Sequence, residues 1–153
     1  GHGTVLGIDV DIREFNKKNI KKSHLIKRIS MIQGSSIDKK VVARVKKFAK
    51  GKKRILLFLD SAHTFEHVLE ELNSYSPLVK KGSYIVVFDT MTENFPNNWF
   101  KKNGTDKTLN KTNNPKTAVH KFLKSNKRFK IDKEFGEKLL ISCAPDGFLK
   151  CVK

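Results

Sequence analysis

The chain has 153 residues, of which 38% are hydrophobic and two are cysteines, and its formal net charge is +17. This length suits one domain with one core, and the apolar content excludes a disordered chain. Two cysteines are too few for a disulfide framework, and no apolar run is long enough to span a membrane. We therefore expect a single domain over residues 1–153, and a cytoplasmic protein because residues 1–4 lack a basic flank followed by a long apolar stretch.

The first third of the chain alternates strand and helix patterns. Residues 4–9 (TVLGID) form a short apolar run that ends in an acid, and residues 14–22 are polar with a helix-compatible composition. Residues 28–33 (RISMIQ) predict a second strand, which is closed by the turn at residues 34–36. Asp38 follows this turn, where its side chain can cap the next helix.

Two further strands follow, and an aspartate comes directly after each. Residues 54–59 (RILLFL) are almost all apolar, as expected for a central strand of a parallel sheet that is buried on both faces. Asp60 comes next, residues 64–72 predict a helix, and residues 83–88 (SYIVVF) predict a strand that precedes Asp89. Repeated strand–helix units predict a parallel sheet with ligand chemistry at the carboxyl ends of its strands.

The alternating pattern stops after the last of these strands. Residues 90–114 are too many for a simple connection in a compact domain, so we expect a lid or a substrate loop there. Pro115 suits the first turn of a helix that continues to about Ser125. Residues 139–143 and 148–152, joined across Ala-Pro-Asp-Gly, predict an antiparallel hairpin at the end of the sheet.

Six segments of the chain, in order and over nearly its whole length, resemble the cephalosporin hydroxylase and rhamnosyl O-methyltransferase family. They are GIDVDIR (7–13), IQGSSID (32–38), LDSAHTFEHVLEEL (59–72), YSPLVKKGSYIVVFDT (75–90), NNPKTAVHKFL (113–123) and APDGFLK (144–150). The resemblance implies an α/β fold with the Rossmann-like sheet of class I methyltransferases, mostly parallel with a C-terminal antiparallel hairpin. The glycine-rich first strand and loop of this fold have no counterpart among the 153 residues, so the resemblance implies a sheet whose first strand is missing.

The resemblance also implies a cofactor site for S-adenosylmethionine. Asp9 matches the acid that this fold places on the ribose hydroxyls of the cofactor, and an ionised carboxylate can accept two such hydrogen bonds. The turn formed by Gln33, Gly34, Ser35 and Ser36 resembles the segment beside the adenine, where glycine permits a close backbone approach and a serine hydroxyl can meet a ring nitrogen.

On the acceptor side, Asp60 and Asp89 resemble the acids that hold a divalent metal in metal-dependent members, and their hard oxygen ligands would suit Mg²⁺. Such a metal would orient the acceptor hydroxyl and lower its pKa. Phe88 stands where metal-binding relatives can carry a second acid, so metal dependence is left open. His63 is a candidate general base near Asp60. Alternatively, His63 orients the turn, and Asp60 caps the helix that follows.

The function that the resemblance implies is that of an enzyme, an S-adenosylmethionine-dependent O-methyltransferase acting on a hydroxyl of a sugar, glycolipid, polysaccharide or small secondary metabolite. A hydroxylase is one alternative, but the two-histidine-one-carboxylate iron pattern is not evident. A basic nucleic-acid-binding module is another alternative. Only five of the 32 basic residues are arginine, the residue that contacts phosphate and guanine in bidentate fashion. We therefore expect no nucleic-acid partner. A homo-oligomer is compatible with the sequence.

Overall fold

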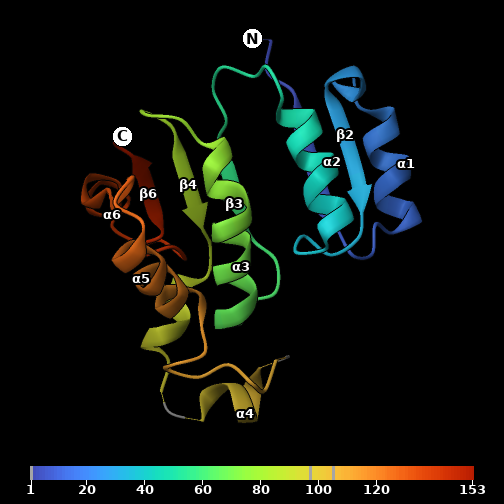
Figure 1. Ribbon diagram of the computed structural model, residues 1–153. Coiled ribbons are helices and arrows are strands. Elements are labelled where there is room, and N and C mark those ends of the chain that lie inside the picture. Colours follow the sequence, from blue (N-terminus) through green and yellow to red (C-terminus); the bar gives the residue numbers. More distant parts are fainter. Residues whose placement is uncertain (1, 97, 105) are drawn as a thin grey trace. The chain divides into compact units, whose positions relative to one another are not determined.

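The computed structural model describes residues 2–96, 98–104 and 106–153. The chain divides into two compact units, Gly1–Lys50 and Gly51–Lys153, and each is described by itself below (Figure 1). The single domain expected over residues 1–153 stays a prediction.

The N-terminal unit contains a two-stranded parallel sheet and two α-helices. Its elements are β1 (Val5–Asp9), α1 (Glu14–Lys22), the 3-10 turn η1 (Ile26–Arg28), β2 (Ile29–Gln33) and α2 (Lys39–Ala49). The two strands are in register from Val5 opposite Ile29 to Asp9 opposite Gln33, so their carboxyl ends meet.

The core of the N-terminal unit is small. It is formed by Ile12, Ile32, Val41 and Val45, the last two being one helical turn apart on α2. The expectation that Asp38 caps this helix is confirmed, because its Oδ1 accepts hydrogen bonds from the first amides of α2 at 2.8 and 3.1 Å. Helix α1 buries none of its residues.

The C-terminal unit holds a four-stranded mixed sheet. Its elements are β3 (Leu57–Leu59), α3 (Phe65–Tyr75), the 3-10 turn η2 (Ser76–Leu78), β4 (Tyr84–Val87), the 3-10 helix η3 (Thr90–Asn94), α4 (Trp99–Asn103), α5 (Pro115–Ser125), β5 (Phe129–Ile131), α6 (Lys133–Leu139) and β6 (Phe148–Cys151). The strand order is β3-β4-β6-β5, with β3 parallel to β4 and the other two pairs antiparallel. A mixed α/β fold is therefore confirmed.

The core of the C-terminal unit lies where α3 and α5 pack against each other (Figure 1). Leu72 of α3 and Val119 and Phe122 of α5 are almost completely buried, as are Ile85 and Val87 of β4. The helix expected from Pro115 to Ser125 is confirmed with these bounds.

The expected hairpin is wrong in its first strand. Strand β6 pairs antiparallel with β4 and β5 and not with residues 139–143, whereas residues 133–139 form helix α6, in which Lys138 pairs with Glu134 one turn earlier. Leu140 then takes a left-handed backbone (φ 58°) that ends the helix, and its side chain is 88% exposed. Phe129, at the start of β5, is only 5% exposed. Burial of its ring therefore favours residues 129–131 as the strand that pairs with β6.

The expectation of a central strand buried on both faces at residues 54–59 is also wrong for the described sheet. Strand β3 spans only three residues and pairs on one side only, with β4, among the described residues. Phe58 is consequently 57% exposed.

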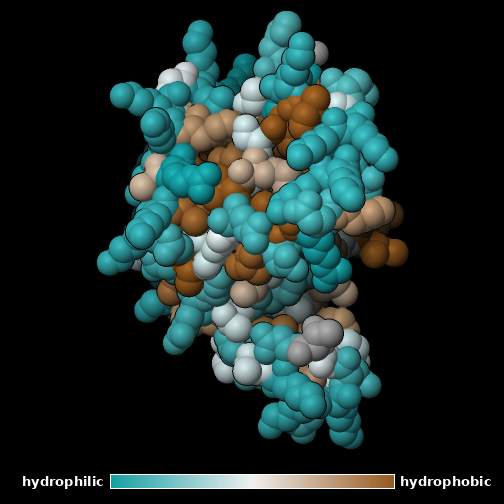
Figure 2. All heavy atoms as spheres, turned by 90° about the vertical axis from the view of Figure 1, so that its right-hand side faces the viewer, coloured by the Kyte–Doolittle hydropathy of each residue, from teal (hydrophilic) through white to brown (hydrophobic). Residues whose placement is uncertain are grey.

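The surface is polar with scattered apolar side chains. Figure 2 shows hydrophilic side chains over much of the face in view with hydrophobic ones between them, as the lysine-rich composition leads us to expect. Within the described part of the chain, no helix combines the length and the apolar character that crossing a membrane requires.

Candidate functional site

The structure brings together Asp60, His63 and Asp89 in the C-terminal unit. The Nε2 atom of His63 lies 3.6 Å from Asp60 Oδ1 and 3.1 Å from Asp89 Oδ2. One possible ligand atom of each residue lies within 4.8 Å of the other two. The three residues therefore form one compact group of a nitrogen and carboxylate oxygens; their catalytic and metal-binding roles stay predictions.

The parallel pair β3 and β4 positions the two aspartates. Leu59 lies opposite Val87, and the amide of Phe88 donates to the carbonyl of Leu59 at 2.9 Å, so the two strands end side by side. Asp60 and Asp89 follow these strand ends, where loops at the carboxyl edge of a parallel sheet converge. Asp89 itself has a left-handed backbone (φ 53°), which turns the chain sharply into η3.

The turn between β3 and α3 is held from both ends. Asn113, in the 90–114 loop, accepts a hydrogen bond at 2.8 Å from the amide of Phe65, the first residue of α3. Ser61 Oγ donates to Glu71 Oε1 at 2.8 Å, and Glu71 is only 2% exposed. The amide of Phe65 at the start of α3 is therefore satisfied by Asn113 and not by Asp60, for which capping of this helix was the alternative role. The hydrogen bond of Ser61 anchors the turn that carries His63 to helix α3.

Glu71 and Asp106 are site neighbours that sequence reasoning missed. The hydroxyl and amide of Thr108 donate to Asp106 Oδ1 and hold the pKa of that carboxyl below its usual value, and the nearby charge of His63 lowers this pKa further. Asp106 therefore adds negative charge within electrostatic reach of His63. Its Asp-Lys-Thr pattern is the local signal of a side-chain turn, but nothing in that pattern predicts what the turn faces.

His67 lies on a half-buried face of helix α3. Its side chain is 18% exposed, and its Nε2 lies 3.7 Å from Glu71 Oε1. The two residues are four positions apart, so they share one face of α3, and this face is directed toward the interior. His67 belongs to the support of the turn and not to the group of Asp60, His63 and Asp89.

The residues expected at the cofactor lie together in the N-terminal unit. Asp9 and Gln33 face each other at the ends of β1 and β2, and the amide of Gly34 donates to the carbonyl of Asp9 at 2.8 Å. Asp9 Oδ1 accepts from the amide of Asp11 at 2.9 Å, whereas Oδ2 has no hydrogen bond among the described residues. An exposed carboxylate with a free oxygen therefore stands at the strand ends.

Gly34 is required by the shape of this turn. Its φ is +148°, and a Cβ added to it would come within 2.8 Å of Val41 Cγ2. Ser35 and Ser36, which follow it, are half-buried, and the carbonyl of Ser35 accepts from the amide of Asp38. The Gln33–Ser36 segment therefore runs directly into the capped start of α2.

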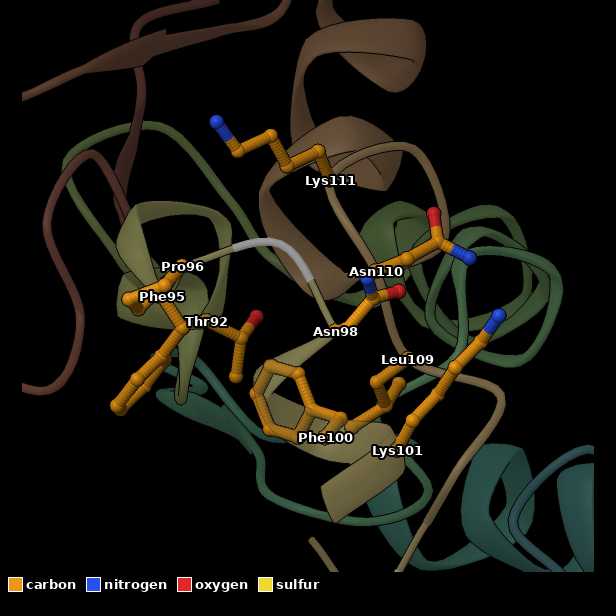
Figure 3. A pocket seen from close by; sticks show the side chains of 9 residues that line it. All are labelled: Thr92, Phe95, Pro96, Asn98, Phe100, Lys101, Leu109, Asn110 and Lys111. Carbon is orange, nitrogen blue, oxygen red and sulfur yellow. The ribbon is translucent and has the colours of Figure 1, made fainter. Parts of the chain in front are cut away.

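The 90–114 loop is more structured than expected, because it includes η3 and α4; its residues 97 and 105 lie outside the described residues. Phe95, Trp99 and Phe100 pack on one another with ring centroids 4.5 to 5.3 Å apart. A pocket of about 470 Å³ is lined by side chains from η3, residues 95, 96 and 98, α4 and residues 109–111; Figure 3 shows these side chains. The lining residues are Thr92, Phe95, Pro96, Asn98, Phe100, Lys101, Leu109, Asn110 and Lys111.

Comparison with known proteins gives a family match and a structural similarity. The sequence profile of the rhamnosyl O-methyltransferase/CmcI family matches residues 1–152. The fold is similar to that of the MycE methyltransferase from the mycinamycin biosynthetic pathway, solved in complex with Mg, SAH and mycinamycin VI, with a TM-score of 0.51 and 19% identity over 80% of this chain. The similarity covers 28% of the MycE chain. No curated protein matches the sequence significantly.

Proposed function

The chain belongs to the rhamnosyl O-methyltransferase/CmcI family, and on this premise we propose that it is the core of an enzyme that transfers a methyl group from S-adenosylmethionine to a hydroxyl. The proposed acceptor is a sugar of a glycolipid or polysaccharide, or a small secondary metabolite. The observation that carries the proposal is the grouping of Asp60, His63 and Asp89 where β3 and β4 end. The SAH and Mg named for the MycE complex support the same cofactor chemistry.

The proposal extends to a Rossmann-like class I methyltransferase sheet. Two parallel strand pairs, β1–β2 and β3–β4, and the antiparallel β6 support it. The glycine-rich first strand of that fold has no counterpart among the 153 residues of the sequence.

Asp9 and the Gln33–Ser36 turn form the proposed cofactor site. The free Oδ2 of Asp9 can accept a hydrogen bond from a ribose hydroxyl. Gly34 gives the turn a backbone conformation that a side chain would strain, and Ser35 and Ser36 supply hydroxyls. This assignment rests on the family resemblance together with the position of these residues at the ends of two parallel strands.

Asp60, His63 and Asp89 offer donor atoms of the kind that bind a divalent cation. Asp60 and Asp89 offer carboxylate oxygens, and the buried Nε2 of His63 makes no hydrogen bond in the described structure. The two carboxylates are ligands of the kind that Mg²⁺, the ion named for the MycE complex, prefers. When bound, S-adenosylmethionine supplies an electrophilic methyl group, and the cation lowers the pKa of a coordinated hydroxyl.

The residues of the chain then position the acceptor hydroxyl and take up its proton. The turn from Asp60 to His63, anchored by Ser61 and Asn113, orients the acceptor hydroxyl. The carboxylates of Asp60 and Asp89 accept its proton, and a neutral His63 can use Nε2 either to accept that proton or to bind a cation. The 90–114 loop is the proposed lid that excludes water.

A methyl-transfer assay with labelled S-adenosylmethionine and a panel of sugar hydroxyls tests the proposal, with mass spectrometry to detect the added methyl group. Asp60→Asn should lower the rate by about 10²- to 10⁴-fold, the range of a lost acid–base group, and leave cofactor affinity unchanged. Asp9→Asn should weaken cofactor binding in calorimetry. The exposed residues Glu66 and Asp11 provide the matched control variants Glu66→Gln and Asp11→Asn.

An Asp60→Asn variant with the full rate would remove the acceptor-site assignment. Neither the family match nor the structural neighbour supports a hydroxylase or a nucleic-acid-binding module. Tight RNA or DNA binding that weakens steeply with salt, without any response to S-adenosylmethionine, would nevertheless overturn the methyltransferase proposal.

A further inference from the structure

We infer that the cation site of this chain uses the His63 imidazole as a third ligand beside Asp60 and Asp89, and therefore prefers a first-row transition ion such as Fe²⁺, Co²⁺ or Zn²⁺ to Mg²⁺. The inference rests on the proposed function, because it concerns the same acceptor site. It assigns His63 Nε2 to the cation, so that the acceptor proton passes to a carboxylate oxygen that is not bound to the ion.

The spacing of the donor atoms fits one ion. Zinc-like ions bind nitrogen and oxygen ligands at about 2.0–2.2 Å, so neighbouring ligand atoms on a tetrahedral or octahedral ion are about 3.0–3.6 Å apart. His63 Nε2 lies 3.1 Å from Asp89 Oδ2 and 3.6 Å from Asp60 Oδ1. All three ligand atoms lie within 4.8 Å of one another, so a rotation of the carboxylates toward a shared ion would bring the three ligands onto one face of it.

The state of His63 Nε2 is the second observation. This atom is inaccessible to solvent and has no hydrogen-bond partner among the described residues, although the ring as a whole is 30% exposed. The nearest polar atoms are the carboxylate oxygens of Asp89 at 3.1 Å and of Asp60 at 3.6 Å, but neither contact has hydrogen-bond geometry, and a desolvated polar atom without a hydrogen bond is unfavourable. The atom lies beside two carboxylates, and a bound cation would interact favourably with all three groups at once.

The third observation is the missing oxygen ligand. Phe88 directly precedes Asp89, so the end of β4 supplies one carboxylate and not two, and the Phe88 ring packs near Phe58 with centroids 6.0 Å apart. Mg²⁺ prefers a full set of oxygen ligands in octahedral geometry. An imidazole nitrogen in place of an oxygen favours iron, cobalt, nickel, copper or zinc.

Titration of the full chain with Co²⁺ tests this inference, because the visible d–d absorption of Co²⁺ reports its ligands without any enzymatic turnover. The variants are made in a His2→Ala, Cys143→Ser background, which removes an imidazole near the N-terminus and an exposed thiol that could bind the ion elsewhere. We expect one Co²⁺ per chain, and a large excess of Mg²⁺ should fail to displace it.

Variants of His63 decide its role. His63→Ala should weaken Co²⁺ binding by at least about tenfold, since even second-shell partners of a metal site contribute 10- to 100-fold to affinity. His63→Glu should restore an all-oxygen set and shift the preference toward Mg²⁺. The exposed His120 provides the matched control, and His120→Ala should leave Co²⁺ affinity unchanged. Thermal unfolding of each variant without metal separates loss of a ligand from loss of the fold.

Equal or tighter binding of Mg²⁺, or Co²⁺ binding that His63→Ala leaves intact, would overturn the inference. Either result leaves the methyltransferase proposal standing, because methyl transfer and S-adenosylmethionine binding are measured separately. Conversely, selective Co²⁺ binding through His63 in a protein that neither binds S-adenosylmethionine nor methylates any acceptor would support the metal assignment and refute the proposed function.

Discussion

Asn114 is the cap of helix α5, and its replacement by alanine should destabilise the C-terminal unit. The residue is fully buried; its Oδ1 accepts from the amide of Thr117 at 3.0 Å, and its Nδ2 donates to the carbonyl of Asn110 at 2.9 Å. Asn114→Ala removes an N-cap worth about 1 kcal/mol and a second hydrogen bond worth about 1 kcal/mol. The free energy of unfolding should fall by about 2 kcal/mol, which lowers the melting temperature of a domain of about 100 residues by about 8–16 °C.

Calorimetry and urea unfolding followed by circular dichroism measure this effect. Asn114→Ser keeps an oxygen that can cap the helix and should lose only about 1 kcal/mol. The control is Asn103→Ala, because Asn103 is exposed and its single weak hydrogen bond to the carbonyl of Trp99 is 3.3 Å long; its stability should change by less than about 0.5 kcal/mol. An Asn114→Ala variant that unfolds at the wild-type midpoint would refute the capping argument.

Three further predictions concern other parts of the chain. Asp38→Ala should cost about 1 kcal/mol by removing the cap of α2, and should speed hydrogen exchange of the first amides of that helix. Gly34→Ala should lower stability in urea by about 1–3 kcal/mol, because its φ of +148° and the approach of Val41 Cγ2 exclude a Cβ without strain. Burial raises the pKa of Tyr75 to about 12, and that of Tyr84 is also raised. An unfolded tyrosine ionises near pH 10, so the unfolded state releases its proton before the folded state does. The stability that comes from the raised tyrosine pKa is therefore complete below about pH 10 and is lost as the pH rises toward 12. The tyrosinate absorbance of the folded chain at about pH 10.5 should stay well below that of the chain in denaturant.

Elements with local signals were predicted closely from the sequence. Helix α5 begins at Pro115 as expected, since the capping asparagine and the proline act within one turn. The C-terminal hairpin was assigned to the wrong first strand because residues 139–143 have an apolar composition but no local feature shows that β6 pairs with residues 129–131 instead. Strand pairing depends on contacts that are distant in sequence, and composition does not record them.

The same distinction holds for the candidate site. The proximity of Asp60 and Asp89 follows from two parallel strands that end together, so the sequence could predict it. The contribution of Asn113 could not be predicted, because it reaches Phe65 across 48 positions of the chain. Glu71 was overlooked for a related reason: a carboxylate on a helix is normally expected in solvent, and only the packing of α3 shows that this one is buried.

Because the amide of Phe65 donates a hydrogen bond to Asn113, hydrogen exchange at Phe65 reports whether the 90–114 loop is in place. While the 90–114 loop keeps its position, this proton is protected; when the loop opens, the amide loses its acceptor and exchanges with solvent. An acceptor molecule that closes the loop should therefore slow exchange at Phe65 in proportion to its occupancy, five residues from Asp60 and without any reaction taking place. Screening of sugars by hydrogen exchange at this single position would identify the acceptor even in a chain that cannot complete the methyl transfer.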